Sequence, residues 1–419
     1  MLRQKAYTFR AESQMAAAGS IADRPIAPVW RREPYRVLFP LGIALAWAGV
    51  LHWGLLAIGA LTEYRSIFHS LAQIEGFMTC FASGFLFTFV PRRTGTPPPS
   101  SWQMLLAVAC PIAIVGFAWA ERWALSQIFW LVFLGNLIAF LVRRARGLPA
   151  KSIPSFVWVP VSVGMSVIAT VLTAVGAIRG PDAMWLHDIG RGMILQGLFT
   201  GLVVGIGGML VPVVTRGAAF PDAGREVSRK RLLHLTLALV FYASFWVEAW
   251  SISLGFAVRG LIAGWALFTA AGIWRPPLLP GIHRWMVWAS AWLLPIGYLF
   301  VAAWPAYRRA GLHVIFIGTF ATMAMAVSLH VVASHCGRMD LLQRKSVRLR
   351  LLAIFLVAAL TCRLFVEFDP THFYRWLGAA AFSFLVATLM WASTVAAALA
   401  KPVGHLPSPA PLPFRAASS

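Results

Sequence analysis

Three histidines are spaced so that they could share one site. His69, His187 and His313 are separated by 118 and 126 residues, and each stands near the start of a long apolar stretch. Imidazole is the commonest side-chain ligand of transition metals and of haem iron. If each stretch is a membrane helix and all three run in the same direction, the imidazoles lie together at the outer mouth of a helix bundle. One such histidine alone is more often an interfacial anchor, so the shared depth is what favours a metal or haem site.

Other polar residues accompany this predicted layer. His52 and His372 fall at the same predicted depth and are secondary candidates for ligands. His187 is followed by Asp188 and Arg191. These two could supply a carboxylate that orients a ligand and a cation for a haem propionate, or they could belong to a solvated loop.

Two buried carboxylates and one further histidine are also candidates. Glu75 and Glu248 lie in apolar stretches without an obvious local partner. An intramembrane carboxylate indicates a proton relay or an ion pathway. The alternative is an ion pair with an arginine of another helix, namely Arg191, Arg259 or Arg363. His335 follows His313 by 22 residues, roughly 33 Å along a helix, so it is a weaker candidate for a second site at the opposite face.

Twelve apolar stretches position these residues, and each is near the ~20 residues that a helix needs to cross a bilayer. The predicted spans are residues 37–59, 67–90, 102–120, 124–142, 154–178, 190–214, 232–254, 256–274, 285–303, 312–334, 350–368 and 375–399. We therefore expect an all-α membrane protein with one twelve-helix domain at 37–399. Residues 1–36 are expected to form a cytoplasmic tail, and residues 400–419 a Pro-rich disordered cytoplasmic tail.

The basic residues set the expected orientation. Of the 36 Lys and Arg residues, 27 lie in the N-terminal tail and in every second gap between spans. By the positive-inside rule both termini are cytoplasmic. The net charge of +22 predicts contact with anionic membrane lipid, and nucleic acid is not expected because no base-reading motif accompanies the charge. The four single cysteines indicate no disulfide framework.

A weak internal repeat has a period of four helices. The second, sixth and tenth spans begin near His69, His187 and His313 and end in PRRTG, PVVTRG and HCGR. This pattern predicts three four-helix units.

Two helical faces carry small residues. The second span has a stripe of small and polar groups, which faces protein and not lipid: His69, Gln73, Gly76, Cys80 and Ser83. The sixth span has two overlapping GxxxG steps, formed by Gly197, Gly201 and Gly205. These allow close approach of a neighbouring helix or, less commonly, of a flat cofactor.

Several segments resemble the NnrS family. They are FPLG (Phe39 to Gly42), the His69 segment that runs on to GFLFTFVPRRTG, GIGGMLVPVVTRG (Gly205 to Gly217) and SHCGR (Ser334 to Arg338). The resemblance covers all twelve spans. It implies a polytopic protein of the bacterial inner membrane that acts in the nitric-oxide response of denitrifying and related bacteria. It also implies haem and copper as cofactors, nitric oxide as a ligand and a respiratory electron donor as a partner, and it leaves open whether the protein is an enzyme.

One departure from the family pattern concerns copper. Where the family typically has HAHEMLFGF, this chain reads HSLAQIEGF, so His69 is kept but Leu71 and Ala72 replace a second His and the Glu. We therefore expect one haem-type centre and little copper.

The predicted architecture also resembles the haem–copper oxidase bundle, a likeness of fold that says little about the reaction. The chain lacks the HPEVY-type segment and the adjacent His pair of the respiratory enzymes, so an oxygen-reducing pump or an authentic nitric-oxide reductase is not expected. The alternatives are a metal-free secondary transporter and an assembly factor for a respiratory complex. A repeat of three times four helices argues against the two matched halves of many transporters.

Overall fold

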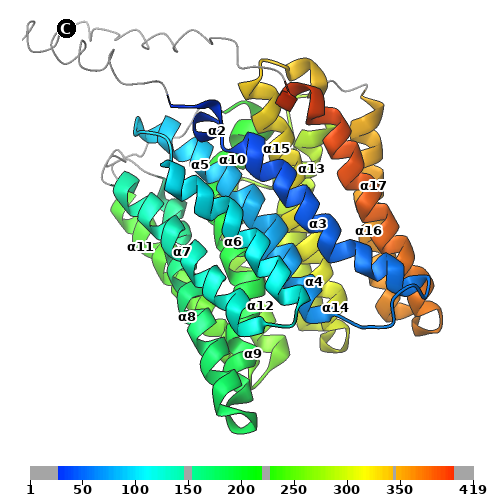
Figure 1. Ribbon diagram of the computed structural model, residues 1–419. Helices are drawn as coiled ribbons and strands as arrows, with labels where there is room; N and C mark the ends of the chain where they lie inside the picture. Colours follow the sequence, from blue (N-terminus) through cyan, green and yellow to red (C-terminus); the bar gives the residue numbers. More distant parts are fainter. Residues whose placement is uncertain (1–26, 146–152, 219–226, 343–345, 401–419) are drawn as a thin grey trace, which may run out of the picture.

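The computed structural model describes residues 27–145, 153–218, 227–342 and 346–400 (Figure 1). The predicted C-terminal tail and most of the predicted N-terminal tail lie outside these ranges. Residues 27–36 contain the short helix α2 (Val29–Arg32) and the start of the first long helix. We call the end of the bundle where α3 begins and α17 ends the terminal side, and the opposite end the far side.

Twelve helices of the described ranges are long and apolar enough to cross a membrane, which confirms the predicted all-α membrane fold. Nine of the spans consist of α3 (Tyr35–Ala57), α6 (Ser101–Trp119), α7 (Trp123–Ala145), α8 (Trp158–Arg179), α11 (Val227–Glu248), α12 (Ile252–Ala266) with η5 (Leu267–Ala271), α13 (Ile282–Ala303), α16 (Val347–Phe368) and α17 (Phe373–Ala400). The other three are compound: α4 (Ser66–Leu71), η1 (Ala72–Met78) and α5 (Thr79–Thr94); α9 (Met184–Gly192), η4 (Met193–Gly197) and α10 (Leu198–Arg216); and α14 (Arg308–His313), η7 (Val314–Ala321) and α15 (Thr322–His335).

Local sequence signals explain where several helices begin and end. Ser100 caps α6 in a capping box with Gln103, which satisfies two backbone N–H groups at the helix start. The second and sixth spans end in the same way, with a glycine as the C-terminal cap. Gly95 and Gly217 each end their helix in the left-handed conformation, with φ of 64° and 66°, which glycine adopts without steric cost.

The three compound spans form the interior of the bundle. In their most apolar windows 89%, 83% and 72% of the residues are buried, whereas no other span exceeds 50%. Side chains of α5, α10 and α15 also line one shared cavity. The second, sixth and tenth spans are therefore a central group, which the other helices separate from lipid.

Each of these inner spans contains a π-helical segment close to its far-side start, namely η1, η4 and η7. A fourth π segment, η5, lies at the end of the eighth span. π-helical turns are rare and occur often at functional sites. Their recurrence at one level in the second, sixth and tenth spans supports the predicted threefold repeat.

Three predicted boundaries were wrong by six residues or more. The tenth span begins at Pro305 and not at residue 312. The sixth span begins at Pro181 and not at residue 190, because Pro181 opens a short 3₁₀ turn that leads directly into α9. The His187–Arg191 segment is therefore helical, and the interpretation as a solvated loop was wrong. The seventh helix ends at Glu248 and not at residue 254, since Ser251 already caps the next helix, α12.

The two small-residue faces pack against neighbouring helices. In the second span His69 Nδ1 lies 2.7 Å from the carbonyl oxygen of Gly49, and Gln73 donates to the carbonyl of Ala46, so the stripe faces α3. In the sixth span a methyl group at Gly201 would meet Ser162 Oγ of α8 at 1.6 Å. These glycines thus serve helix packing, as the commoner of the two interpretations predicts.

Candidate functional site

His69 is the last residue but two of α4, at the far side. Its Nδ1 is 2.7 Å from the carbonyl oxygen of Gly49 on α3. A carbonyl only accepts, so Nδ1 carries the proton and Nε2 keeps its lone pair. Metal-ligating histidines commonly hold the ring in this way.

His313 ends α14 and has the same arrangement. Its Nδ1 donates to the carbonyl oxygen of Arg309, one turn earlier, at 2.7 Å. Arg363 lies within electrostatic range of both His69 and His313, and the two histidines lie within range of each other. The two histidines and Arg363 of α16 thus form one electrostatic group in which both imidazoles present Nε2.

His52 extends this group on α3. It is 3% exposed, and its ring centroid lies 4.2 Å from Trp53, 5.4 Å from Phe68 and 6.1 Å from His69. Trp53 also packs edge-on against His69 at 5.5 Å. The rings of His52 and Trp53 therefore cover the imidazole of His69 on the α3 side.

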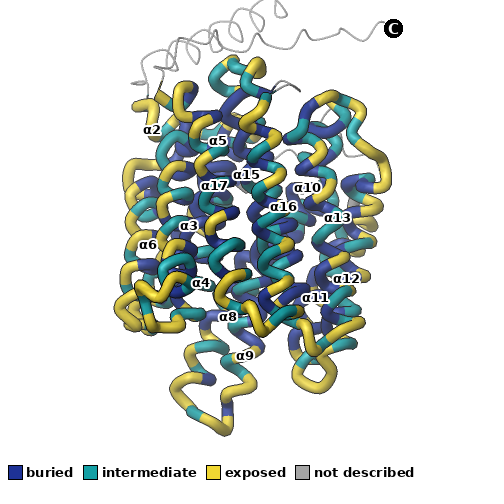
Figure 2. The backbone as a smooth tube through the Cα atoms, turned by 90° about the vertical axis from the view of Figure 1, so that its right-hand side faces the viewer, coloured by how far each residue is buried: buried dark blue, intermediate teal, exposed yellow. Residues whose placement is uncertain are grey.

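His187 lies farther from the membrane centre than the other two histidines. His69 precedes η1 by three residues and His313 precedes η7 by one, whereas His187 precedes η4 by six. At 1.5 Å per residue this difference amounts to about 5 to 8 Å. The hairpin between α8 and α9 projects beyond the rest of the far side and is largely exposed (Figure 2). The sequence reasoning placed the three rings at one depth, and the structure places His187 one turn outside.

On the sixth span Arg191, and not His187, lies at the level of His69 and His313. It precedes η4 by two residues, and it lies within electrostatic range of Asp188 and of Arg308 on α14. The ring of His187 instead contacts Asp188, with Nδ1 3.3 Å from Oδ1. Among the described residues no group of three or more His, Cys, Asp or Glu side chains is arranged to hold a metal ion. The histidine layer therefore presents prepared ring nitrogens from His69 and His313, and His187 stands apart.

His372 is a surface residue of the far side. Its ring is about half exposed and its Nδ1 lies 2.9 Å from Asp369. Hydrogen bonds from Trp376 and His372 lower the pKa of the Asp369 carboxyl. Asp369 thus accepts hydrogen bonds from two side chains near the start of α17.

The carboxylates of Glu75 and Glu248 have different hydrogen-bond partners. Glu75, fully buried in η1, accepts two hydrogen bonds from Gln127 Nε2 of α7 at 3.1 and 3.0 Å. Glu248 is bound by Arg259 and Arg308. The ion-pair alternative is therefore confirmed for Glu248 and not found for Glu75, whose partner is an amide.

The terminal side holds a separate polar cluster that contains His335. Its ring lies 5.4 Å from that of Tyr35, whose hydroxyl donates to Glu33 at 2.9 Å. Burial favours the protonated form of Glu33, but hydrogen bonds from Arg36 and Tyr35 and the charges of Arg36 and Arg92 outweigh it and lower the pKa of that carboxyl. His335 thus packs in a structural junction between α3, α15 and α17.

A histidine pair near this side was missed by sequence reasoning. His283 on α13 and His330 on α15 stack with ring centroids 5.7 Å apart. Both ring nitrogens of His283 and Nδ1 of His330 lack a hydrogen-bond partner among the described residues. The two residues are 47 positions apart in the chain, so only the packing of α13 on α15 brings them together.

The chain was compared with curated proteins and with protein-family models. No curated protein matches the chain. The family model described as NnrS protein matches residues 29–402, which include all twelve spans. The chain therefore belongs to the NnrS family.

Proposed function

We propose that this protein holds a haem at the far side of the bundle through His69 and His313 and acts through it in the nitric-oxide response. Membership of the NnrS family supports a membrane protein of that response. The twelve spans make it a multi-pass membrane protein. The haem, its ligands and its reaction are the parts that we propose.

One observation carries the proposal. His69 and His313 lie at equivalent places on two inner spans, and each donates Nδ1–H to a backbone carbonyl at 2.7 Å. A mere interfacial anchor has no need of a fixed tautomer, whereas a ligand does. The shared orientation of two separate imidazoles supports ligation better than packing.

The surrounding residues fit a haem. Arg191 and Arg363 supply cations at this level for the propionates. Trp53 and the ring of Phe316, 5.9 Å from that of His313, supply apolar contacts. Haem held by one of the two imidazoles would bind nitric oxide at the iron, whereas haem held by both would serve electron transfer. The chain's part is to hold the group, to orient both imidazoles and to exclude water.

The location follows from the charge pattern. We propose that the protein lies in a bacterial inner membrane with both termini in the cytoplasm, so that the far side faces the periplasm. Membrane lipid contacts the outer helices, and a respiratory electron donor is the proposed redox partner. Copper has weaker support, because Leu71 and Ala72 offer no ligand beside His69.

The rival functions differ in what they need. A metal-free transporter of the common kind has two matched halves, whereas the π segments recur in three helices spaced by four. An assembly factor for a respiratory complex needs no ligand at the far side, so it gives no reason for the matching bonds of His69 and His313.

The test is the visible spectrum of protein purified in detergent after expression with excess haem, recorded before and after addition of a nitric-oxide donor. We expect stoichiometric haem with an absorption band that shifts on addition of nitric oxide. Repeated purification without haem would overturn the proposal and favour the transporter or the assembly factor. Haem that does not respond to nitric oxide would refute the role of this centre as the nitric-oxide site.

A further inference from the structure

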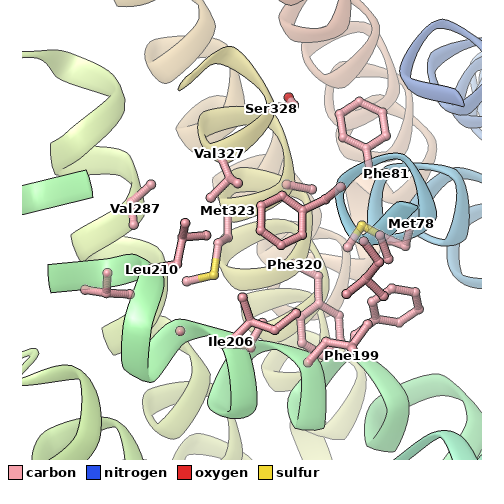
Figure 3. Close-up of a pocket in the computed structure, with 18 of the residues that line it drawn as sticks. Met78, Phe81, Phe199, Ile206, Leu210, Val287, Phe320, Met323, Val327 and Ser328 are labelled. Carbon is pink, nitrogen blue, oxygen red and sulfur yellow. The ribbon is translucent and has the colours of Figure 1, made fainter. Parts of the chain in front are cut away.

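A cavity of about 100 Å³ lies between the three inner spans. Figure 3 shows side chains from α5, α10, η7 and α15 directed into one space, among them Phe81, Ile206, Phe320 and Met323. The cavity occurs where the three helices that form the interior of the bundle fail to fill the volume between them.

The lining is almost wholly apolar. Ser328 is the only polar residue among those that line it. Its hydroxyl donates to the carbonyl of Met325 at 2.8 Å and accepts from Trp391 Nε1 at 2.8 Å. A water molecule needs two to four polar partners, and this cavity offers at most the remaining lone pair of the Ser328 hydroxyl, so we expect it to be dry.

The position of the cavity relates it to the histidine layer. The first lining residues of the inner spans are Met78, Phe199 and Phe320. They follow His69, Arg191 and His313 by nine, eight and seven residues, or about 10 to 14 Å. They lie within two residues of the ends of η1, η4 and η7, so the cavity is on the membrane-interior side of the proposed site.

We propose that this cavity binds a small apolar molecule of the size of a xenon atom or a diatomic gas. An engineered apolar cavity of about 150 Å³ stays dry and binds benzene or xenon. Pockets for drug-sized ligands need roughly 300–1,000 Å³, so neither a haem nor a quinone ring system fits here. The assignment of nitric oxide as the natural occupant rests on the proposed function, whereas binding of xenon does not.

Gly207 offers a way to fill the cavity without disturbing the helices. It lines the cavity, and a methyl group added there would have its nearest contacts at 3.7 Å to Leu267 and 3.8 Å to Val211. Because Gly207 lines the cavity beside Val211, we expect the longer side chain of a Gly207→Leu variant to reduce the cavity volume. Gly164 is a matched control on α8: it is exposed, and nothing lies within 4 Å of an added methyl group.

The experiment is ¹²⁹Xe NMR titration of haem-free protein in detergent. We expect saturable xenon binding in the unmodified protein and in Gly164→Leu, and loss of that binding in Gly207→Leu, with unfolding temperature confirming that each variant is folded. If Gly207→Leu does not fold, Ala324→Leu, from another inner span, serves the same purpose. Equal binding in the filled variant, or none in the unmodified protein, would overturn the proposal, as would a lipid or detergent chain found in the cavity.

A second titration separates the natural occupant from the probe. Nitric oxide added to the haem-free protein is expected to displace bound xenon competitively. Because no haem is present, this result does not depend on whether the far-side site exists. Xenon binding without displacement would refute nitric oxide as the occupant. Competitive displacement in the haem-free protein would support nitric oxide as the occupant, whether or not the far side holds a haem.

Discussion

Removal of the Glu248 carboxylate is expected to be among the most damaging single changes outside the histidine layer. Arg259 of α12 is 0% exposed. Its guanidinium bonds Glu248 and Gln196, the latter at 2.8 Å, and lies over the ring of Phe256 at 4.0 Å. Glu248 is its only anionic partner among the described residues.

The magnitude follows from burial. Removing one partner of a buried ion pair costs about 3–5 kcal/mol, because an uncompensated charge is left behind. Glu248 is 11% exposed and also binds Arg308 at the surface, while Arg259 keeps its bond to Gln196. We therefore expect Glu248→Ala to cost about 3 kcal/mol, near the lower end of that range. Replacing both residues, as Glu248→Leu with Arg259→Met, should recover much of the loss.

Unfolding can be followed in detergent with a thiol-reactive dye, since Cys80 and Cys110 are buried in the native state. The control is Asp340→Ala, which removes the partner of Arg338 from an exposed pair and should change stability little. A loss for Glu248→Ala no larger than that for Asp340→Ala, or a double variant worse than Glu248→Ala, would refute the argument from buried charge.

Three other outcomes follow from particular residues. Leu71→His should add copper binding without displacing what His69 holds. Positions 69 and 71 point about 200° apart around the helix, so the two rings cannot share one metal. Stoichiometric copper in the unmodified protein, measured by metal analysis, would contradict this. The depressed pKa of Glu33 contributes stability above its ordinary pKa of 4.5, and that contribution is lost as the pH falls below this value. Glu33→Gln should therefore show a smaller loss of unfolding temperature on acidification than the unmodified protein, and equal acid sensitivity would count against it. Reporter fusions should be active in the cytoplasm at residues 95, 147, 225 and 343 and outside at residues 63, 181 and 371; an outside signal at 225 would contradict the orientation.

The sequence predicted the spans well because hydropathy and length are local properties. It failed where the helix departs from 3.6 residues per turn. The depth of His187 was inferred from apolar boundaries, and the sixth span begins nine residues earlier than that pattern indicated. The π segments that align the inner spans leave no mark on composition, so the level of Arg191 could be found only from the fold.

The sequence also could not predict which side chains of different helices contact one another. Arg363 and Glu367, four residues apart, pair as their spacing predicts. Glu75 instead pairs with Gln127, and the stacking of His283 on His330 joins two spans. These contacts depend on helix packing, which periodicity restricts to a face but does not assign to a neighbour.

We propose that His69 and His313 hold a haem at the far side. The direct measurement is haem content with the visible and electron paramagnetic resonance spectra of the unmodified protein, His69→Ala and His313→Ala, with His372→Ala as the far-side control. We predict stoichiometric haem in the unmodified protein and in His372→Ala, and loss of haem or altered axial ligation in the other two variants. His187→Ala should have a smaller effect, since its ring lies one turn farther out. Full haem content with unchanged spectra in both His69→Ala and His313→Ala would contradict the account.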